Sequence, residues 1–262
     1  MSTRAEMISD FYTKCDEDTR LERSRRGQLE YFTTMEYIHR YAGKGSKVLE
    51  VGAGTGRYSI ALAKEGMDVT AVELVENNLK VLRKNSEGIK NIQSYQGDAT
   101  DLSRFADGSF DVTLFFGPMY HLYESADVNK AIDEAIRVTK KDGVIMFAFI
   151  SVYAIMYANY LYGNWGVGEE ENFTKDYKFR HFQEQMFTGY DIEEFEGLFR
   201  EKAVDRITTA GTDCFLEAVQ KRDDFAFTDE DFESFKKWYL AFAEKRELLG
   251  ATNHLLYICR KK

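Results

Sequence analysis

One short segment constrains this chain more than any other. Residues 47–56 read KVLEVGAGTG, an apolar run that passes into a loop with glycine at every second position. Glycine lets the backbone turn tightly and lets a ligand lie against the main chain where a Cβ would collide. A helical pattern follows over residues 57–65, and a helix start offers unpaired N–H groups to a ligand. The segment therefore predicts a strand, loop and helix that hold a nucleotide-like cofactor.

Charge and cysteine content narrow the class of protein. A chain of 262 residues is long enough for one α/β domain with insertions. Its net charge of −9 argues against a nucleic-acid partner, because phosphate binding usually leaves a basic footprint. The cysteines, Cys15, Cys214 and Cys259, lack the spacing of a zinc site or a disulfide framework. We expect no metal and a cytoplasmic protein, since residues 1–14 also lack the apolar run of a signal peptide.

Residues 144–162 carry no charge and are about long enough to span a bilayer. They follow a turn signal at residues 140–143, and their first half has the composition of a buried strand. Their second half contains Ser151, Asn159 and four tyrosines. A buried strand followed by an aromatic helix explains this pattern better than a membrane span.

Strand and helix patterns alternate from residue 45 to residue 150. The expected strands are 47–51, 68–73, 92–96, 110–116 and 144–150, and the expected helices are 58–65, 75–85 and 127–139. This alternation predicts a Rossmann-like, doubly wound, mostly parallel sheet. Residues 1–44 are expected to form a helical lid and residues 151–190 an aromatic cap. Residues 191–262 complete the core with a helix at 191–201, strands at 204–209 and 254–259, and a helical insertion at about 212–248 that contains one long helix, 217–246.

The motif around the glycines resembles a known family. Glu50 to Gly56, E-V-G-A-G-T-G, is similar to the first motif of class I S-adenosylmethionine-dependent methyltransferases. It differs from a dinucleotide fingerprint in its GxGxG spacing and in the acidic residue two positions before the first glycine. A carboxylate there repels a pyrophosphate and attracts an ammonium or a sulfonium. The resemblance implies S-adenosylmethionine as cofactor and a sheet of about seven strands, the last antiparallel.

Further residues follow the pattern of that family over residues 45–150. Glu73 ends the second strand, and the resemblance implies that it accepts hydrogen bonds from the ribose hydroxyls. Asp98 lies in Gly97-Asp98-Ala99 after the third strand and is implied to accept from the adenine amino group. The resemblance completes the cofactor-binding set, which is Glu50, Gly52, Ala53, Gly54, Gly56, Glu73, Leu74, Asp98, Ala99 and Gly117.

The loop after the fourth strand, Gly117-Pro118-Met119-Tyr120-His121, lies where open α/β sheets bind ligands. A hydroxyl acceptor would need a base, for which His121 is the candidate, with Tyr120 to orient the substrate. A thiol or an amine that is already deprotonated would need none. The alternative is that both residues only shape the loop.

The sequence therefore predicts a methyltransferase that acts on a small-molecule acceptor at an undetermined O, N or S atom. Two alternatives stay open: an RNA or protein methyltransferase, and a non-catalytic protein that binds S-adenosylmethionine or another nucleotide. The aromatic residues between 153 and 190 are compatible with a substrate cap or with an oligomer contact, and the oligomeric state is open.

Overall fold

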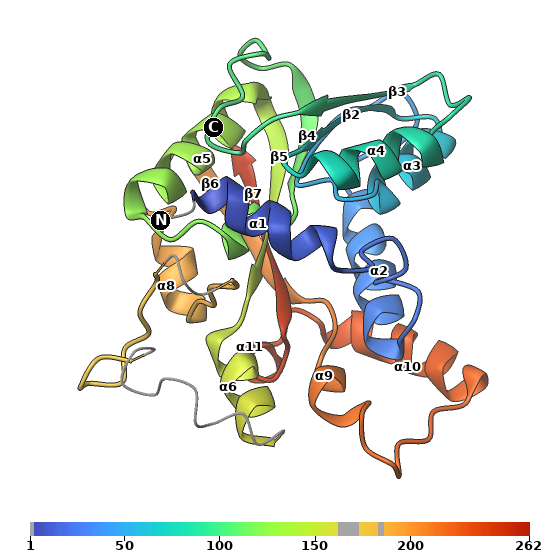
Figure 1. The fold of residues 1–262 in the computed structure, drawn as a ribbon, viewed down its shortest axis with the longest axis vertical. Helices are drawn as coiled ribbons and strands as arrows, with labels where there is room; N and C mark the ends of the chain where they lie inside the picture. The colour runs from blue at the N-terminus through green and yellow to red at the C-terminus, as the bar shows by residue number, and fades with distance from the viewer. Residues whose placement is uncertain (1–2, 162–172, 183–185) are drawn as a thin grey trace.

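A seven-stranded sheet forms the centre of the computed structural model, which describes residues 3–161, 173–182 and 186–262 (Figure 1). The strand order is β3-β2-β1-β4-β5-β7-β6. The first five strands pair in parallel, and β7 is antiparallel to both β5 and β6. The predicted doubly wound sheet with an antiparallel last strand is confirmed. The strands are β1 (Lys47–Val51), β2 (Asp68–Glu73), β3 (Ile92–Gln96), β4 (Phe110–Phe115), β5 (Thr139–Ile150), β6 (Val204–Gly211) and β7 (His254–Lys261).

Side chains that alternate along each strand build one core on each face of the sheet. Ile145, Phe147 and Phe149 of β5 pack with α5 (Ser125–Val138) and α8 (Ile192–Gly197) on one face. Val144 and Met146 pack with α2 (Arg25–His39), α3 (Arg57–Lys64) and α10 (Asp229–Phe242) on the other. Strands buried on both faces explain why the sequence shows continuous apolar runs rather than alternation.

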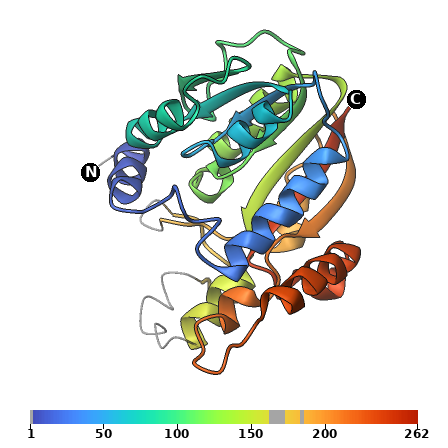
Figure 2. The same cartoon turned by 90° about the vertical axis from the view of Figure 1, so that its right-hand side faces the viewer.

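The remaining helices have different positions. They are α1 (Arg4–Thr13), α4 (Glu76–Asn85), the 3-10 turn η1 (Pro118–Tyr120), α6 (Val152–Leu161), α9 (Leu216–Val219) and α11 (Arg246–Leu249). Helix α4 packs along β2 and β3, and α11 contacts β6. Helix α1 packs on α4, while α2 packs on α9 and α10 (Figure 2). In the described part of the chain, no helix combines the length and apolarity that a bilayer crossing requires.

Two expected elements differ from the structure. The long helix expected at 217–246 is wrong, because α9, α10 and α11 divide that stretch. A non-helical segment separates α9 from α10. At its end, the Thr228 side chain accepts a hydrogen bond from the backbone N–H of Asp231 and so caps a new helix that begins at Asp229. Strand β5 is expected to begin at Val144, but it begins at Thr139. Thr139 pairs with Phe110, and the intervening residues form a bulge that includes Asp142 at φ 63°.

The segments predicted as lid, cap and insertion contain the following elements, and their roles stay predictions. Helices α1 and α2 lie within residues 3–44, and α9 to α11 lie between β6 and β7. In the expected aromatic cap, residues 162–172 and 183–185 lie outside the described part of the chain. Its described residues are divided: Tyr190 is buried, while Tyr153 and Tyr177 are exposed.

Candidate active site

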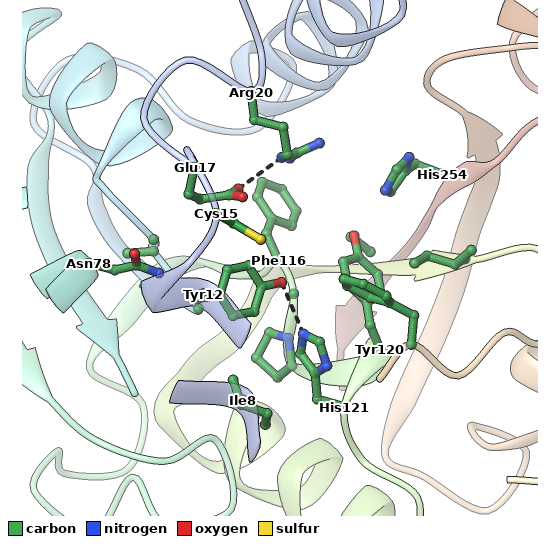
Figure 3. A pocket seen from close by; sticks show the side chains of 18 of the residues that line it. Ile8, Tyr12, Cys15, Glu17, Arg20, Asn78, Phe116, Tyr120, His121 and His254 are labelled. Carbon is green, nitrogen blue, oxygen red and sulfur yellow. Dashed lines mark hydrogen bonds and ion pairs between the residues drawn. The ribbon is translucent and has the colours of Figure 1, made fainter. Parts of the chain in front are cut away.

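A cavity of about 700 Å³ lies at the carboxyl ends of the parallel strands. The loops after β1, β2, β3 and β4 line one part of it, and α1, α2 and the start of β7 line another. Residues 15–23, the end of β5, α6 and residues between 179 and 187 also contribute to its wall. Figure 3 shows Asn78 at one side of this cavity and His254 at the other, with Tyr12 and Phe116 between them. The topology therefore gathers residues from both ends of the chain around one space.

Each of the three glycines in the loop after β1 is required for a different structural reason. Gly52 has φ 82°, and a Cβ there would lie 2.2 Å from the carbonyl oxygen of Phe116. Gly54 has φ 54°, and its Cβ position meets only the Glu17 side chain, at 3.7 Å, so it leaves room in the cavity. Gly56 has φ 92° as the N-cap of α3, and a Cβ there would lie 2.8 Å from Leu82. The loop thus leaves backbone open to a ligand at Gly54.

Glu50 is buried at the end of β1 and lines the cavity. Its side chain accepts a hydrogen bond from the Ser59 hydroxyl. Burial raises the pKa of this carboxyl to about 8, with smaller opposing effects from Ser59. A positively charged ligand group near Glu50 would favour its ionised form.

Glu73 is also buried, and its two oxygens accept different backbone N–H groups. Oε2 accepts from Gly54 at 2.7 Å and Oε1 from Val75 at 2.8 Å. Burial raises the pKa of Glu73, opposed by these bonds. Asn78 also hydrogen-bonds the Glu73 side chain, so a carboxylate with about four acceptor positions keeps one for a donor from the cavity.

Asp98 and the lid helix α1 are joined by an ion pair. Asp98 Oδ1 accepts from the backbone N–H and the hydroxyl of Thr100, and Oδ2 lies 2.6 Å from Arg4 Nη2. Thr13, at the other end of α1, accepts a hydrogen bond from Asn77 on α4. Both ends of α1 are therefore tied to the predicted cofactor side of the cavity.

His121 has a hydrogen bond at each ring nitrogen. Nδ1 lies 2.7 Å from the carbonyl oxygen of Met186, which can only accept, so Nδ1 carries the proton. Nε2 then accepts from the Tyr12 hydroxyl at 3.1 Å. Burial lowers the pKa of His121 to about 4, so the ring is neutral at physiological pH. Tyr120, the other predicted catalytic residue, lies beside it in the cavity wall with a pKa raised by burial.

Most of the predicted cofactor-binding residues meet at the cavity. Gly56 is the exception, because it faces Leu82 rather than the cavity lining. The residues brought together are Glu50, Gly52, Ala53, Gly54, Glu73, Leu74, Asp98, Ala99 and Gly117. Their individual roles stay predictions.

A group of charged residues that the sequence did not single out lines the opposite end. Glu30 is buried on α2 and binds Arg20 through two bonds of 2.8 and 2.9 Å. Burial by itself raises the pKa of Glu30, but Arg20 and its neighbours lower it to about 2. Asp213 and His254 complete the group with Arg26. Only one feature of the sequence indicates this group: Glu30 is a charged residue within the apolar face of the segment that forms α2.

Glu30, Asp213 and His254 also form a group that could hold a metal ion. One ligand atom from each lies within 4.8 Å of the others. Arg20 and Arg26 already face these carboxylates, and two guanidinium groups oppose a divalent cation. The expectation of no metal stays a prediction.

The strand order, the GxGxG loop after β1 and the acidic residue at the end of β2 together define the class I S-adenosylmethionine-dependent methyltransferase fold. Residues 49–147 match the family model described as "Methyltransferase domain". This part of the chain is therefore a methyltransferase domain of that class.

Two curated relatives are demethylmenaquinone methyltransferases. The protein of Clavibacter sepedonicus is 39% identical over 108 residues, which cover 41% of this chain and 42% of the relative. The protein of Staphylococcus aureus (strain JH9) is 36% identical over 126 residues, which cover 45% of this chain and 50% of the relative. The chain thus matches half or less of the length of these relatives.

Solved structures share the fold over nearly the whole chain. N-methyltransferase NodS from Bradyrhizobium japonicum WM9, solved with S-adenosyl-l-homocysteine, superposes with a TM-score of 0.61 at 13% identity and covers 99% of each chain. PH0226 protein from Pyrococcus horikoshii OT3 gives 0.61 at 18% identity, covering 97% of this chain and 99% of that one. The [4+2]-cyclase SpnF gives 0.52 at 14% identity, covering 88% and 81%. The domain match and these neighbours support S-adenosylmethionine as the cofactor.

Proposed function

We propose that this chain transfers a methyl group from S-adenosylmethionine to a small-molecule acceptor. One observation carries the proposal: the cavity of about 700 Å³ is continuous from the glycine loop to the charged group on α2 and β7. Pockets of about 300–1,000 Å³ are typical of small-molecule sites. A cofactor and a small acceptor can therefore share one enclosed space.

The residues at the β1–β3 end fit that cofactor. The open side of Gly54 lets the cofactor lie against the backbone, and Glu73, which lines the cavity, keeps acceptor capacity for a ribose hydroxyl beyond its bonds from Gly54, Val75 and Asn78. Glu50 would become ionised opposite the ammonium group. When bound, S-adenosylmethionine supplies a methyl group attached to a positively charged sulfur. The chain's contribution is to align the acceptor with this group and to exclude water.

Tyr120 and His121 remain proposed acceptor-side residues. Their loop follows β4, next to the glycine loop, and Gly52 and Gly117 pack close together. His121 can act as a base only when Tyr12 moves, because the Tyr12 hydroxyl occupies Nε2. Both residues can orient an acceptor without accepting its proton.

The relatives do not identify the acceptor of this chain. The family match covers residues 49–147 and the relatives cover 41–45% of the chain, whereas the charged wall at the other end of the cavity comes from α2, the segment after β6 and the start of β7. An RNA or protein acceptor is the weaker alternative, since the net charge is −9 and the acceptor wall carries buried carboxylates. A non-catalytic or non-methylating protein is the other, because the same fold carries a [4+2]-cyclase. Three free cysteines support a reducing compartment such as the cytoplasm.

Isothermal titration with S-adenosylmethionine, S-adenosylhomocysteine and NAD tests the cofactor. We expect the first two to bind and NAD not to bind. Binding of NAD alone would end the proposal. Release of S-adenosylhomocysteine in the presence of thiol, amine, phenol and carboxylate compounds then tests methyl transfer, and binding without release from any acceptor class would favour the non-catalytic alternative.

A further inference from the structure

The junction between β6 and β7 holds a buried histidine–aspartate pair that faces the cavity. His254 is the first residue of β7, and Asp213 lies two residues after the end of β6. His254 Nδ1 is 2.8 Å from Asp213 Oδ2, and the aspartate is fully buried. His254 lines the cavity beside Tyr120 (Figure 3).

The bonds of Asp213 fix which ring nitrogen carries the proton. Oδ1 accepts the backbone N–H groups of Asn253 at 2.9 Å and of His254 at 3.0 Å. Oδ2 faces the imidazole at 2.8 Å and Arg26 Nη1 at 3.6 Å, and a carboxylate can only accept, so Nδ1 donates. Arg26 Nη1 and Asn253 Nδ2 also approach Nδ1, at 3.4 and 3.3 Å, but both are donors and lie farther away. Whenever the ring is neutral, its lone pair is therefore on Nε2.

That lone pair is available to a ligand. Among the described residues, no hydrogen bond reaches Nε2 of His254, whereas Nε2 of His121 accepts from Tyr12. The environment is charged on several sides: Arg26 and Glu30 face the pair from α2, and Glu217 faces Arg26 from α9. His254 thus has the orientation of a base held by a carboxylate.

The His254–Asp213 pair lies at the β7 side of the sheet, away from the glycine loop. The glycine loop follows β1, and β7 is three strands away through β4 and β5. Neighbouring strands are about 4.8 Å apart, which puts the two sites at about 14 Å along the sheet edge. This separation leaves space for a cofactor and an acceptor between them in the shared cavity.

We propose that His254 is the general base of the acceptor site and that Asp213 positions it, an inference that rests on the proposed methyl transfer. The acceptor hydroxyl gives its proton to Nε2, and the oxygen lone pair forms the new bond to the methyl carbon. The bond between that carbon and sulfur breaks, and its electron pair stays on sulfur. Asp213 stabilises the imidazolium, which then releases the proton to water. The acceptor class is an alcohol, a phenol or an enol, since its reacting atom carries a proton at neutral pH.

The tautomer of His254 tests the assignment without any acceptor. Nitrogen-15 NMR of the imidazole rings, with His254 identified by loss of its signals in His254→Gln, should show a proton on Nδ1 and none on Nε2. In Asp213→Asn the amide oxygen can keep both backbone N–H bonds while its NH₂ group faces Nδ1. We expect the ring to switch to the Nε2–H tautomer, with S-adenosylmethionine affinity unchanged. A proton on Nε2 in the unmodified protein, or no switch in Asp213→Asn, would overturn the proposal.

A matched set of probes tests the acceptor class. Phenol, thiophenol and aniline share a ring and differ in the reacting atom. We expect methylation of phenol, with kcat reduced about a hundredfold or more in His254→Gln and in Asp213→Asn, because general bases typically contribute that much. Turnover of thiophenol or aniline alone, or phenol turnover unchanged in His254→Gln, contradicts the inference. Failure of the proposed function looks different, because the unmodified protein would then bind no S-adenosylmethionine or would release no S-adenosylhomocysteine with any of the three probes.

Discussion

The two ends of the cavity are built in opposite ways. The cofactor end comes from consecutive strand–loop–helix units, and its shape depends on the backbone of three glycines and on buried carboxylates at strand ends. The other end, where we propose that the acceptor binds and which we call the acceptor end, is assembled from α2, η1 and the β6–β7 junction. These elements are far apart in the chain. A backbone-built site leaves a local motif in the sequence, whereas a site assembled from distant side chains leaves none.

The largest effect is expected at Gly52. The change Gly52→Ala should abolish cofactor binding and lower the free energy of unfolding by about 2–4 kcal/mol, through the strain of positive φ and a steric clash. A Cβ there meets the Phe116 carbonyl oxygen at 2.2 Å. Chemical denaturation and titration with S-adenosylmethionine measure the two effects.

Gly45 provides the matched control. Its φ is 85°, close to that of Gly52, but nothing lies within 4 Å of its Cβ position. Gly45→Ala should therefore cost only about 1 kcal/mol of backbone strain and leave binding intact. Equal losses in the two variants would show that strain alone, and not the close approach of β4, decides the shape of the loop.

The next effect is expected at Glu73, the proposed ribose contact of the cofactor end. Glu73→Gln should weaken S-adenosylmethionine binding by about 2–3 kcal/mol, since charge-assisted hydrogen bonds contribute on that scale. The exposed Glu76, which pairs with Lys80 on the surface of α4, is the control, and Glu76→Gln should bind normally. Unchanged affinity in Glu73→Gln would remove Glu73 from the ribose contact.

The sequence predicted the cofactor end in detail because its information is local. The ends of β1, β2 and β3 match the predicted strands, and the motif places Glu50, Glu73 and Asp98 at the same edge. The division of 217–246 was also local: Thr228 before Asp229-Glu230-Asp231 is a helix-start signal. It was outweighed by the apolar spacing of the aromatic residues that follow.

The acceptor end could not be predicted in the same way. Asp213 and His254 are 41 residues apart and meet because β6 and β7 pair antiparallel. Neither periodicity nor spacing encodes that pairing. The sequence indicates His121 as the candidate base because it lies in the loop after the fourth strand, and no local pattern marks His254. The structure adds the partners of both rings, which local patterns do not contain.

Glu50 should link cofactor binding and stability to pH. Its pKa in the folded protein is about 8, against an ordinary 4.5, so folding takes up a proton between these values. Stability should therefore fall as pH rises through this range, by about 2 kcal/mol from pH 6 to pH 8. Denaturation at several pH values should show this slope in the unmodified protein and its loss in Glu50→Gln.

The same carboxyl gives a binding signature. A cationic ligand favours ionised Glu50, so S-adenosylmethionine binding at pH 7 should release protons, and the apparent affinity should rise toward pH 8. Calorimetry in buffers of different ionisation enthalpy measures this release, and subtraction of the Glu50→Gln result removes the contribution of the ligand amino group. Identical proton release in both proteins would mean that Glu50 stays protonated in the complex.

The smallest effect is expected at the lid, where α1 contacts both ends of the cavity. Arg4 pairs with Asp98 at the cofactor end and Tyr12 bonds His121 at the other. Arg4→Ala should speed cofactor dissociation by less than about fivefold, because partly exposed ion pairs contribute about 0.2–1 kcal/mol. Thr13→Ala breaks the bond from α1 to Asn77 without touching Asp98, and stopped-flow dissociation rates compare the two variants. Equal acceleration would mean that lid closure alone retains the cofactor, whereas an effect confined to Arg4→Ala would place Arg4 with the cofactor-binding residues and extend that end of the cavity to the N-terminal helix.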